Sequence, residues 1–316
     1  MQDSSLSSLS SPPFPFKLSI VIPMYNEEQG ARECVRRVKE VLNSMECDHE
    51  IIFVNDGSAD NTLALLIDEK SRDDKLRIVD LSRNFGHQAA ITAGLDRSTG
   101  DCVIVIDGDL QDPPEVFPRL VEKWQEGYDV VHARRIKRKG MSFLAHLRAK
   151  VYYRIMRAIS EIDIPVDVGD FRLISKRVCD NLRELREKHR YIRGLATWVG
   201  YKQTIIEYDR EERFAGVPQY TFAKLVHLSM AGLTGFSKFP LRLGVILGAF
   251  CFALCLLFAL VLMIWPAQTA GWTPAVIAIL FVGALELICL GIIGEYLALG
   301  LEHHRDRPLY IVQEEY

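Results

Sequence analysis

Short apolar segments alternate with longer amphipathic segments along the first half of the chain. Four runs rich in Val, Ile, Leu and Phe have the length of buried strands, and they lie at 17–22, 50–54, 76–81 and 103–106. Between them, apolar residues recur at helical spacing, for example over 29–43. Strands that alternate with helices in this way predict an α/β fold with a doubly wound, mostly parallel sheet.

A cluster of polar residues follows each of the four expected strands. The clusters are Tyr25-Asn26-Glu27, Asp56-Gly57-Ser58, Asn84 with Gly86, and Asp107-Gly108-Asp109. Parallel strands end at the same edge of a sheet, where open α/β sheets bind their ligands. We therefore expect one nucleotide-binding pocket rather than four unrelated loops. The sequence has neither G-x-G-x-x-G nor G-x-x-x-x-G-K, which argues against a dinucleotide fold or a P-loop.

Two carboxylates, those of Asp107 and Asp109, follow the fourth strand with one glycine between them. Gln111 adds an amide oxygen, and Pro113-Pro114 is expected to open a helix. Oxygen ligands of this kind suit a hard cation, Mg²⁺ or Mn²⁺, which would neutralise a diphosphate. The alternative is a polar turn whose acids only cap the following helix.

Three motifs in combination resemble the family 2 glycosyltransferases of the GT-A fold. The motifs are Pro23-Met24-Tyr25-Asn26-Glu27, Asp56-Gly57-Ser58 and the sequence DGDLQDPPE from Asp107 to Glu115. Within this family the chain is similar to the polyprenyl-phosphate glycosyltransferases, the group of dolichol-phosphate mannose synthase and bactoprenol glucosyltransferase. The resemblance covers about the first 220 residues.

The resemblance implies roles for residues in these motifs. The base and ribose of a nucleotide sugar would be held by Pro23, Tyr25, Glu27 and Asp56. The metal and the diphosphate would be held by Asp107, Asp109 and Gln111, and Asp107 and Asp109 would thereby serve catalysis. UDP-glucose is the first expectation for the donor, followed by GDP-mannose and UDP-GlcNAc. Gly108 stands where the family more often has Ala, a difference that we expect to have no effect.

The acceptor side of the site is expected after a fifth strand at 128–133. The basic run from Arg134 to Gly140 is either a solvated loop or a clamp for a phosphate or anionic lipids. The resemblance places Asp167 and Asp170 beside the acceptor as candidate bases. A phosphate monoester has its second pKa near 6 and is a nucleophile at neutral pH, so we favour a structural or positioning role for these two acids.

A second acceptor-side segment partly matches the family's R-x-x-G-x-S-K-Y loop. Arg213, Gly216 and Tyr220 agree with it, whereas Pro218-Gln219 replaces the usual Ser-Lys. The resemblance implies that Arg213 contacts either the acceptor phosphate or the leaving diphosphate, and that Tyr220 belongs to the site of the acceptor phosphate. Because this lysine is missing, other cations such as Arg134 must bind the phosphate.

Composition narrows the classes of function. The 316 residues carry a formal net charge of −3, which gives no reason to expect a nucleic acid partner. The seven cysteines form no C-x-x-C pair, so we expect a reducing compartment and neither zinc nor a disulfide framework. The apolar content of 49% is at the upper end for a soluble protein, and much of the excess lies after Leu241, which points to a membrane.

Two apolar stretches, 243–264 and 275–297, are long enough to cross a bilayer, which takes about 20 residues. Trp265 and Trp272 flank the loop between them, as in an interfacial aromatic belt. Lys238 and Arg242 precede this hairpin, and Arg305 and Arg307 follow it. The positive-inside rule then places both termini and the enzyme domain on the cytoplasmic face, in a bacterial cell membrane if the resemblance holds.

The expected organisation is therefore a soluble domain on a membrane anchor. Its parts are a disordered tail (1–16), a GT-A domain (17–220), an interfacial amphipathic helix (221–240), two transmembrane helices (241–300) and a cytoplasmic tail (301–316). Small residues in the second span, Gly283, Gly291 and Gly294, allow close helix packing, so a homo-oligomer is expected.

The predicted activity is the inverting, metal-dependent transfer of a single sugar from a nucleotide sugar to a polyprenyl phosphate. Two alternatives stay open. A processive polysaccharide synthase of the same superfamily would carry a Q-x-x-R-W motif, which is not found in the sequence. A non-enzymatic membrane partner that only binds nucleotide sugar would not need the acids Asp107 and Asp109.

Overall fold

The computed structural model describes residues 15–136, 168–188, 190–209, 273–304 and 307–316, and parts of 244–257. The chain divides into two units. The first contains most of the residues up to 222 together with Pro308–Tyr316, and the second contains 223–307. The first unit holds the predicted site.

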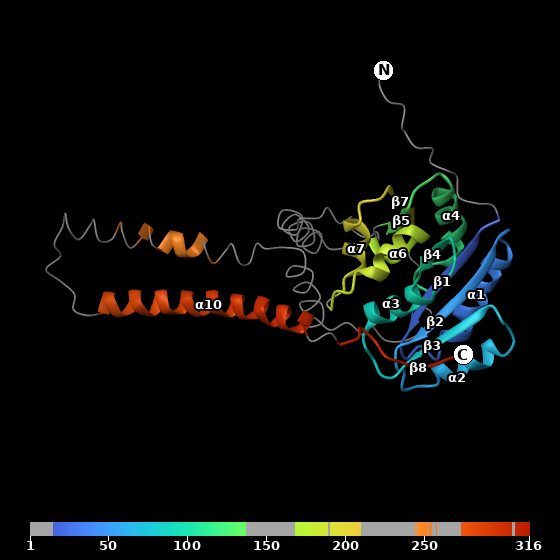
Figure 1. Ribbon diagram of the computed structural model, residues 1–316, viewed down its shortest axis with the longest axis horizontal. Helices are drawn as coiled ribbons and strands as arrows, with labels where there is room; N and C mark the ends of the chain where they lie inside the picture. The colour runs from blue at the N-terminus through green and yellow to red at the C-terminus, as the bar shows by residue number, and fades with distance from the viewer. Residues whose placement is uncertain are drawn as a thin grey trace, which may run out of the picture. The chain divides into compact units, whose positions relative to one another are not determined.

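The first unit is built on one eight-stranded sheet (Figure 1). Its strands are β1 (Lys17–Met24), β2 (Asp48–Asn55), β3 (Leu76–Leu81), β4 (Cys102–Val105), β5 (Val130–Arg135), β6 (Val168–Ser175), β7 (Gln203–Tyr208) and β8 (Val312–Glu315). The order across the sheet is β7-β5-β6-β4-β1-β2-β3-β8. Only β6 and β8 run antiparallel to the others, so the prediction of a mostly parallel α/β sheet is confirmed.

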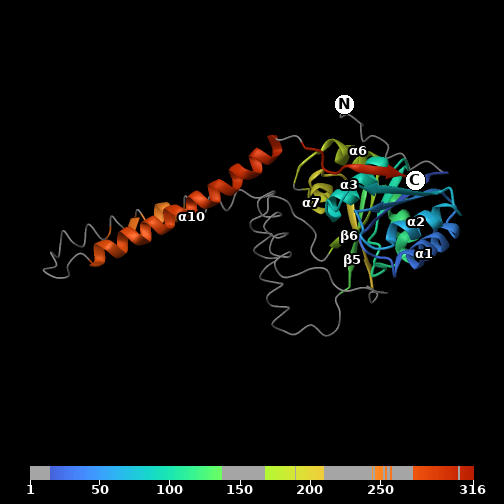
Figure 2. The same ribbon diagram turned by 90° about the horizontal axis from the view of Figure 1, so that it is seen from below.

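Helices cover both faces of this sheet (Figures 1 and 2). They are α1 (Ala31–Asn43), α2 (Thr62–Lys70), α3 (His87–Arg97), the short η1 (Pro114–Val116), α4 (Phe117–Gln125), α6 (Lys176–Glu184) and α7 (Ile192–Trp198). On one face, apolar residues of α1, α2 and α4 pack on the sheet in the main core. On the other face, Ala90 and Ala93 of α3 pack on β2 and β3. Strands apolar on both faces are thus explained by helices on both faces.

The first strand extends past the expected end at 22, through Pro23 to Met24. Its pairing with β4 stops at Val21 opposite Val105, whereas its pairing with β2 continues to Met24 opposite Asn55. Pro23 therefore lies where one side of β1 has no ladder partner, and the missing N–H of proline costs nothing there.

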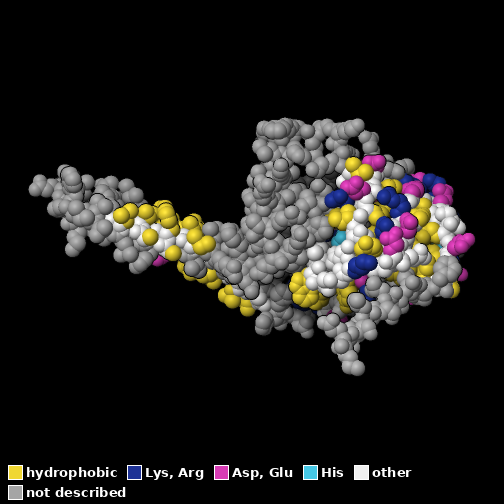
Figure 3. Space-filling view, turned by 90° about the horizontal axis from the view of Figure 1, so that it is seen from above, with side chains coloured by type: hydrophobic (Ala, Val, Ile, Leu, Met, Phe, Trp, Pro, Cys, Tyr) yellow, Lys and Arg dark blue, Asp and Glu magenta, His cyan; other side chains and the backbone are white. Residues whose placement is uncertain are grey.

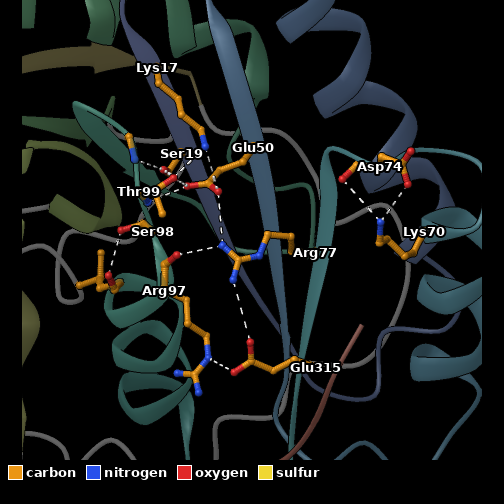
Figure 4. Close-up of polar contacts among 12 residues, drawn as sticks. Lys17, Ser19, Glu50, Lys70, Asp74, Arg77, Arg97, Ser98, Thr99 and Glu315 are labelled. Atoms are coloured by element: carbon orange, nitrogen blue, oxygen red, sulfur yellow. Dashed lines mark hydrogen bonds and ion pairs between the residues drawn. The ribbon is translucent and has the colours of Figure 1, made fainter.

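The last strand, β8, corrects the expected boundaries. The sequence placed 301–316 in a cytoplasmic tail, but β8 pairs with β3 and completes the edge of the sheet. Figure 4 shows Glu315 meeting Arg97, at 2.5 Å, and Arg77, at 3.9 Å. The Tyr310 hydroxyl donates to Asp96 at 2.6 Å. The first unit therefore includes a segment that lies about 90 residues beyond the expected domain end at 220.

In the second unit, α10 (Thr273–His304) is a 32-residue helix. It contains Phe281–Ala298, the one stretch among the described residues that is long and apolar enough to cross a membrane. Its apolar side chains are exposed, as the yellow atoms of Figure 3 show. The expected helix at 221–240 and most of the first expected span lie outside the described residues, so the two-helix anchor is not confirmed.

Candidate active site

The topology brings several acids to one edge of the sheet. The carboxyl ends of β1, β2 and β4 lie there because these strands are parallel. Since β6 runs antiparallel to β4, its beginning, with Asp170, lies at the same edge as Asp107. This arrangement brings together two acids that are 63 positions apart in the sequence.

His87 lies between these two acids. Its Nε2 is 3.3 Å from Oδ1 of Asp107 and 3.4 Å from Oδ2 of Asp170. His87 is the first residue of α3 and follows Gly86, whose φ of +100° starts the helix in a conformation that favours glycine. Desolvation lowers the pKa of His87, but Asp107 and Asp170 outweigh it and raise this pKa to about 9, so the imidazole is cationic at neutral pH.

Asp170 is held by several cations. Arg172 Nη2 lies 3.3 Å from its carboxylate and Arg193 Nη2 lies 3.5 Å away, while Gln88 Nε2 donates to it at 3.2 Å. Burial alone would raise the pKa of Asp170, but the charge of Arg193 and the contacts with His87 keep it well below its usual range. An acid this strong is a poor proton acceptor, which supports a positioning role for Asp170 rather than that of a base.

Asp56 is buried and holds the loop that precedes α3. Its two carboxylate oxygens accept hydrogen bonds from the backbone N–H groups of Phe85, at 2.7 Å, and Gly86, at 3.0 Å. Burial raises the pKa of Asp56 although both hydrogen bonds act against this shift. Gly57 follows with a φ of +64°, packed against the backbone of Arg83 and Asn84. Asp56 thus fixes the position from which His87 enters the site.

The loop after β1 is fastened to the loop after β2. The backbone N–H of Asn26 donates to Ser58 Oγ at 3.0 Å, and Asn26 Oδ1 accepts from Ala59 N at 2.8 Å. Three of the four residues expected to hold the nucleoside lie on or just after β1 and differ in exposure: Pro23 is buried, whereas Tyr25 and Glu27 are partly exposed. These hydrogen bonds therefore join the two loops beside the acids.

The chemistry of Asp107 and its neighbours fits a divalent cation. Oδ1 of Asp107 is buried and accepts no hydrogen bond from the described residues. Burial raises the pKa of Asp107 to about 6, helped by the nearby acids Asp112, Asp170 and Asp109 and opposed by His87. A bound cation relieves such an accumulation of carboxylates. Asp109 Oδ1 accepts from the Gln111 N–H at 3.1 Å, so the second acid and the amide belong to the same tight turn.

Gly108, between the two acids, is enclosed. A Cβ added there would lie 2.3 Å from Met24 Sδ and 2.8 Å from Met24 Cε. An alanine at this position therefore requires the flexible end of the Met24 side chain to move, which methionine allows at low cost. The expectation that the difference between Gly and Ala has no effect stays a prediction.

A largely buried cluster of Asp112, Arg135 and Tyr208 anchors the loop that follows β4. Arg135 Nη2 lies 3.0 Å from Asp112 Oδ2, and the Tyr208 hydroxyl donates to Asp112 Oδ1. Arg134, the neighbouring residue on β5, instead pairs with Glu207 at 2.5 Å on the surface. A phosphate would have to compete with Glu207 for Arg134.

Comparison with known proteins decides the family. Residues 19–183, just over half of the chain, match the family model described as Glycosyl transferase family 2. This chain is a family 2 glycosyltransferase. It is 44% identical to an uncharacterised glycosyltransferase, YkcC, of Bacillus subtilis over 302 residues, covering 94% of each chain. It is also 37% identical to the bactoprenol glucosyl transferase of Shigella phage SfX over 301 residues, covering 94% of this chain and 99% of the relative.

Solved structures resemble this glycosyltransferase less closely. One is glucosyl-3-phosphoglycerate synthase from Mycobacterium tuberculosis, 19% identical, covering 72% of this chain and 80% of that one with a TM-score of 0.46. Another is mannosyl-3-phosphoglycerate synthase from Rubrobacter xylanophilus, 18% identical, covering 68% and 71% with a TM-score of 0.47.

The structure assembles part of the predicted site. Asp56, Asp107 and Asp170 are all linked to α3, while Asp167, Arg213 and Tyr220 lie outside the described residues of the glycosyltransferase. Sequence reasoning missed His87 and Arg193. For His87 there was a signal, because it belongs to the polar cluster after β3, but a lone histidine gave no reason to pair it with Asp107.

Proposed function

We propose that this glycosyltransferase transfers one sugar, glucose before other candidates, from a nucleotide sugar to a polyprenyl phosphate. The observation that carries the proposal is the 37% identity to a bactoprenol glucosyl transferase across 94% of this chain and 99% of the relative. A match over nearly the full length covers the apolar C-terminal region as well as the acidic site.

On the donor side, the proposal assigns Pro23, Tyr25, Glu27 and Asp56 to the nucleoside of UDP-glucose. Asp107, Asp109 and Gln111 would hold Mg²⁺ or Mn²⁺, which supplies charge neutralisation for the diphosphate. Oδ1 of Asp107, which is buried and accepts no hydrogen bond from the described residues, supports this assignment.

On the acceptor side, the proposal needs no proton to be removed. A phosphate monoester is largely a dianion at neutral pH, and one of its oxygens attacks the anomeric carbon from the face opposite the nucleoside diphosphate. The new C–O bond forms as the bond to the diphosphate breaks, so the anomeric centre inverts. Asp170, ionised and held by His87 and Arg193, fits a reaction without a base better than one with a base.

For the location, we propose an integral membrane protein with two spans and a cytoplasmic enzyme domain. The apolar stretch of α10 supports one span, and the cations on both sides of the apolar region support the orientation. The small residues Gly283, Gly291 and Gly294 on α10 are consistent with a homo-oligomer in the membrane.

The test is transfer of label from UDP-glucose into organic-extractable lipid by membranes that contain the protein, polyprenyl phosphate and Mg²⁺. The expected result is labelled lipid that disappears with a chelator. Asp109→Asn should lower the rate at least about a hundredfold, since a metal ligand contributes several kcal/mol. Asp74→Asn, on an exposed loop acid, is the matched control and should leave the rate unchanged.

Other results would change the proposal. Label from GDP-mannose or UDP-GlcNAc alone would replace the sugar, and a labelled polymer would indicate a processive synthase. Nucleotide-sugar binding without turnover under any of these conditions would leave a binding protein and contradict the proposed transfer.

A further inference from the structure

Hydrogen-bond donors converge on Asp170. Its carboxylate lies within 3.5 Å of Arg172, Arg193 and His87, and His87 also contacts Asp107. Nη1 of Arg172 and Nε of Arg193 have no hydrogen-bond partner among the described residues. A cluster of basic side chains with donors left over matches the chemistry of a bound anion.

The three basic side chains differ in their access to a ligand. Arg172 is a β6 residue with a side chain only 1% exposed, and it donates to the carbonyl oxygens of Gly169 and Asp170. It therefore neutralises Asp170 from inside the protein. His87 and Arg193 approach from the other side with side chains 32% and 28% exposed, so both can touch a substrate.

The scaffold fixes these two side chains relative to each other. Gln88 donates from Nε2 to Asp170 at 3.2 Å and accepts from the backbone N–H of Ile192 at 2.9 Å. It thus connects the start of α3, with His87, to the start of α7, with Arg193. The first turn of the 11-residue α3 adds its own positive potential beside His87.

We propose that His87 and Arg193 form a phosphate-binding pair, held in place by Asp170, for a phosphate group of a substrate. The inference rests on the proposed function for its ligands, a nucleoside diphosphate on the donor side and a polyprenyl phosphate on the acceptor side. Both carry the same chemistry, dense negative charge with several acceptor oxygens. Asp170 is a positioning residue in this arrangement, because it acts through His87 and Arg193.

The experiment measures binding and turnover in separate arms on the purified full-length protein. The variants are His87→Gln and Arg193→Gln, which remove the charge, with His87→Lys and Arg193→Lys, which keep it. Arg186→Gln is the matched control, since Arg186 pairs with Asp96 at 2.7 Å on the surface outside the site. The binding arm titrates UDP and uridine in the presence of Mn²⁺, and the turnover arm varies a short-chain polyprenyl phosphate.

If the pair holds the donor diphosphate, the two glutamine variants should bind UDP at least about tenfold more weakly while uridine binding is unchanged. If it holds the acceptor phosphate, UDP binding should stay the same while KM for the polyprenyl phosphate rises about tenfold or more. Restoring the charge with lysine should recover part of either loss.

The proposal is wrong if neither UDP binding nor the acceptor KM changes by more than about twofold in folded glutamine variants. It is also wrong if UDP and uridine are lost together and lysine restores nothing, because that pattern indicates a structural role. The UDP arm does not depend on the identity of the acceptor. Failure of lipid labelling in the wild type would therefore count against the proposed function without deciding the role of this pair.

Discussion

Gly57 and Gly127 both have a positive φ, +64° and +87°, but their surroundings differ. A Cβ at Gly57 would lie 2.4 Å from the backbone carbon of Arg83, whereas a Cβ at Gly127 would meet nothing within 4 Å. The backbone around Gly57 cannot yield easily, because the neighbouring Asp56 fastens the loop at Phe85 and Gly86.

We predict that Gly57→Ala destabilises the protein far more than Gly127→Ala. At Gly127 only the left-handed conformation is penalised, about 1–2 kcal/mol. At Gly57 the clash adds at least about 2 kcal/mol to that penalty. Thermal unfolding of the two variants in detergent measures the difference, and equal losses would show that the turn after β2 relaxes freely.

Glu50 is a buried acid on β2, away from the site. Its carboxylate accepts from Ser19 Oγ at 2.6 Å and from the Thr99 N–H at 2.7 Å, and Lys17 and Arg77 lie 3.4 Å away (Figure 4). Burial raises the pKa of Glu50, but these hydrogen bonds and the charge of Lys17 outweigh it, so the pKa is lower in the folded state.

A lowered carboxyl pKa has a defined effect on stability against pH. Ionised Glu50 contributes stability that is fully present above the unfolded pKa of about 4.5 and is lost as the pH falls through the lower folded pKa. Glu50→Gln should therefore be less stable than the wild type at pH 7, with the gap closing below pH ~4.5. Denaturant unfolding at several pH values measures it, and a gap independent of pH would contradict the assignment.

At the level of elements, Asp112 connects three of them. The loop after β4 carries Asp112, the end of β5 carries Arg135, and the end of β7 carries Tyr208. The residues after β5 and after β7 include the predicted acceptor-side segments, so this cluster fixes where both leave the domain.

We predict that Asp112→Ala is much more damaging than Tyr208→Phe. Removing the acid leaves the charge of Arg135 without its acidic partner in a largely buried place, which costs about 3–5 kcal/mol. Removing the hydroxyl loses two hydrogen bonds, one donated to Asp112 and one accepted from Arg135 Nε, together about 1–3 kcal/mol. Urea unfolding of both variants tests the order, and a loss for Tyr208→Phe as large as that for Asp112→Ala would contradict it.

The sequence predicted five of the parallel strands because each contains a short cluster of apolar, mostly β-branched residues. It did not predict β6, whose VGDFRLIS contains Gly, Asp and Arg. Only the folded sheet shows that Arg172 of this strand is held by backbone carbonyls and Asp170. Nor did it predict β8, since nothing local marks VQEE as the partner of β3.

The same limit applies to the site. Asp107 and Asp56 were found because each follows an apolar strand within a recognisable motif. Arg193 was not, because its contact with Asp170 is created by the packing of α7 against α6 and β6. Contacts between residues far apart in the sequence have no local pattern from which they can be derived.

At the scale of the whole molecule, α10 lies between β7 and β8 in the sequence, and this order restricts the membrane topology of the chain. Both strands belong to one sheet, so the chain leaves and returns on the same side of any membrane. The number of crossings between 209 and 307 must then be even. If α10 is one of them, a second lies within 210–272, which supports the proposed span at 243–264.

Protease-cleavable tags test this topology in intact cells. A tag inserted within 266–272, between the proposed spans, should be cleaved by protease added outside. A tag joined after Tyr316 should be cleaved only after lysis, because β8 keeps that end with the enzyme domain. Cleavage of both tags from the same side would show that α10 does not cross the membrane.

The pairing of β8 with β3 also sets an order of assembly during synthesis. The ribosome makes β8 only after α10, so β3 has an open edge until the apolar helix has left the ribosome. Backbone groups of Ile78 and Ser82, which pair with Tyr316 and Ile311 in the finished protein, remain available to other strands during this time. Delayed membrane insertion would therefore leave the edge of β3 open to pairing with other strands for longer. Conversely, the sheet can be complete only after the helix preceding β8 has been made.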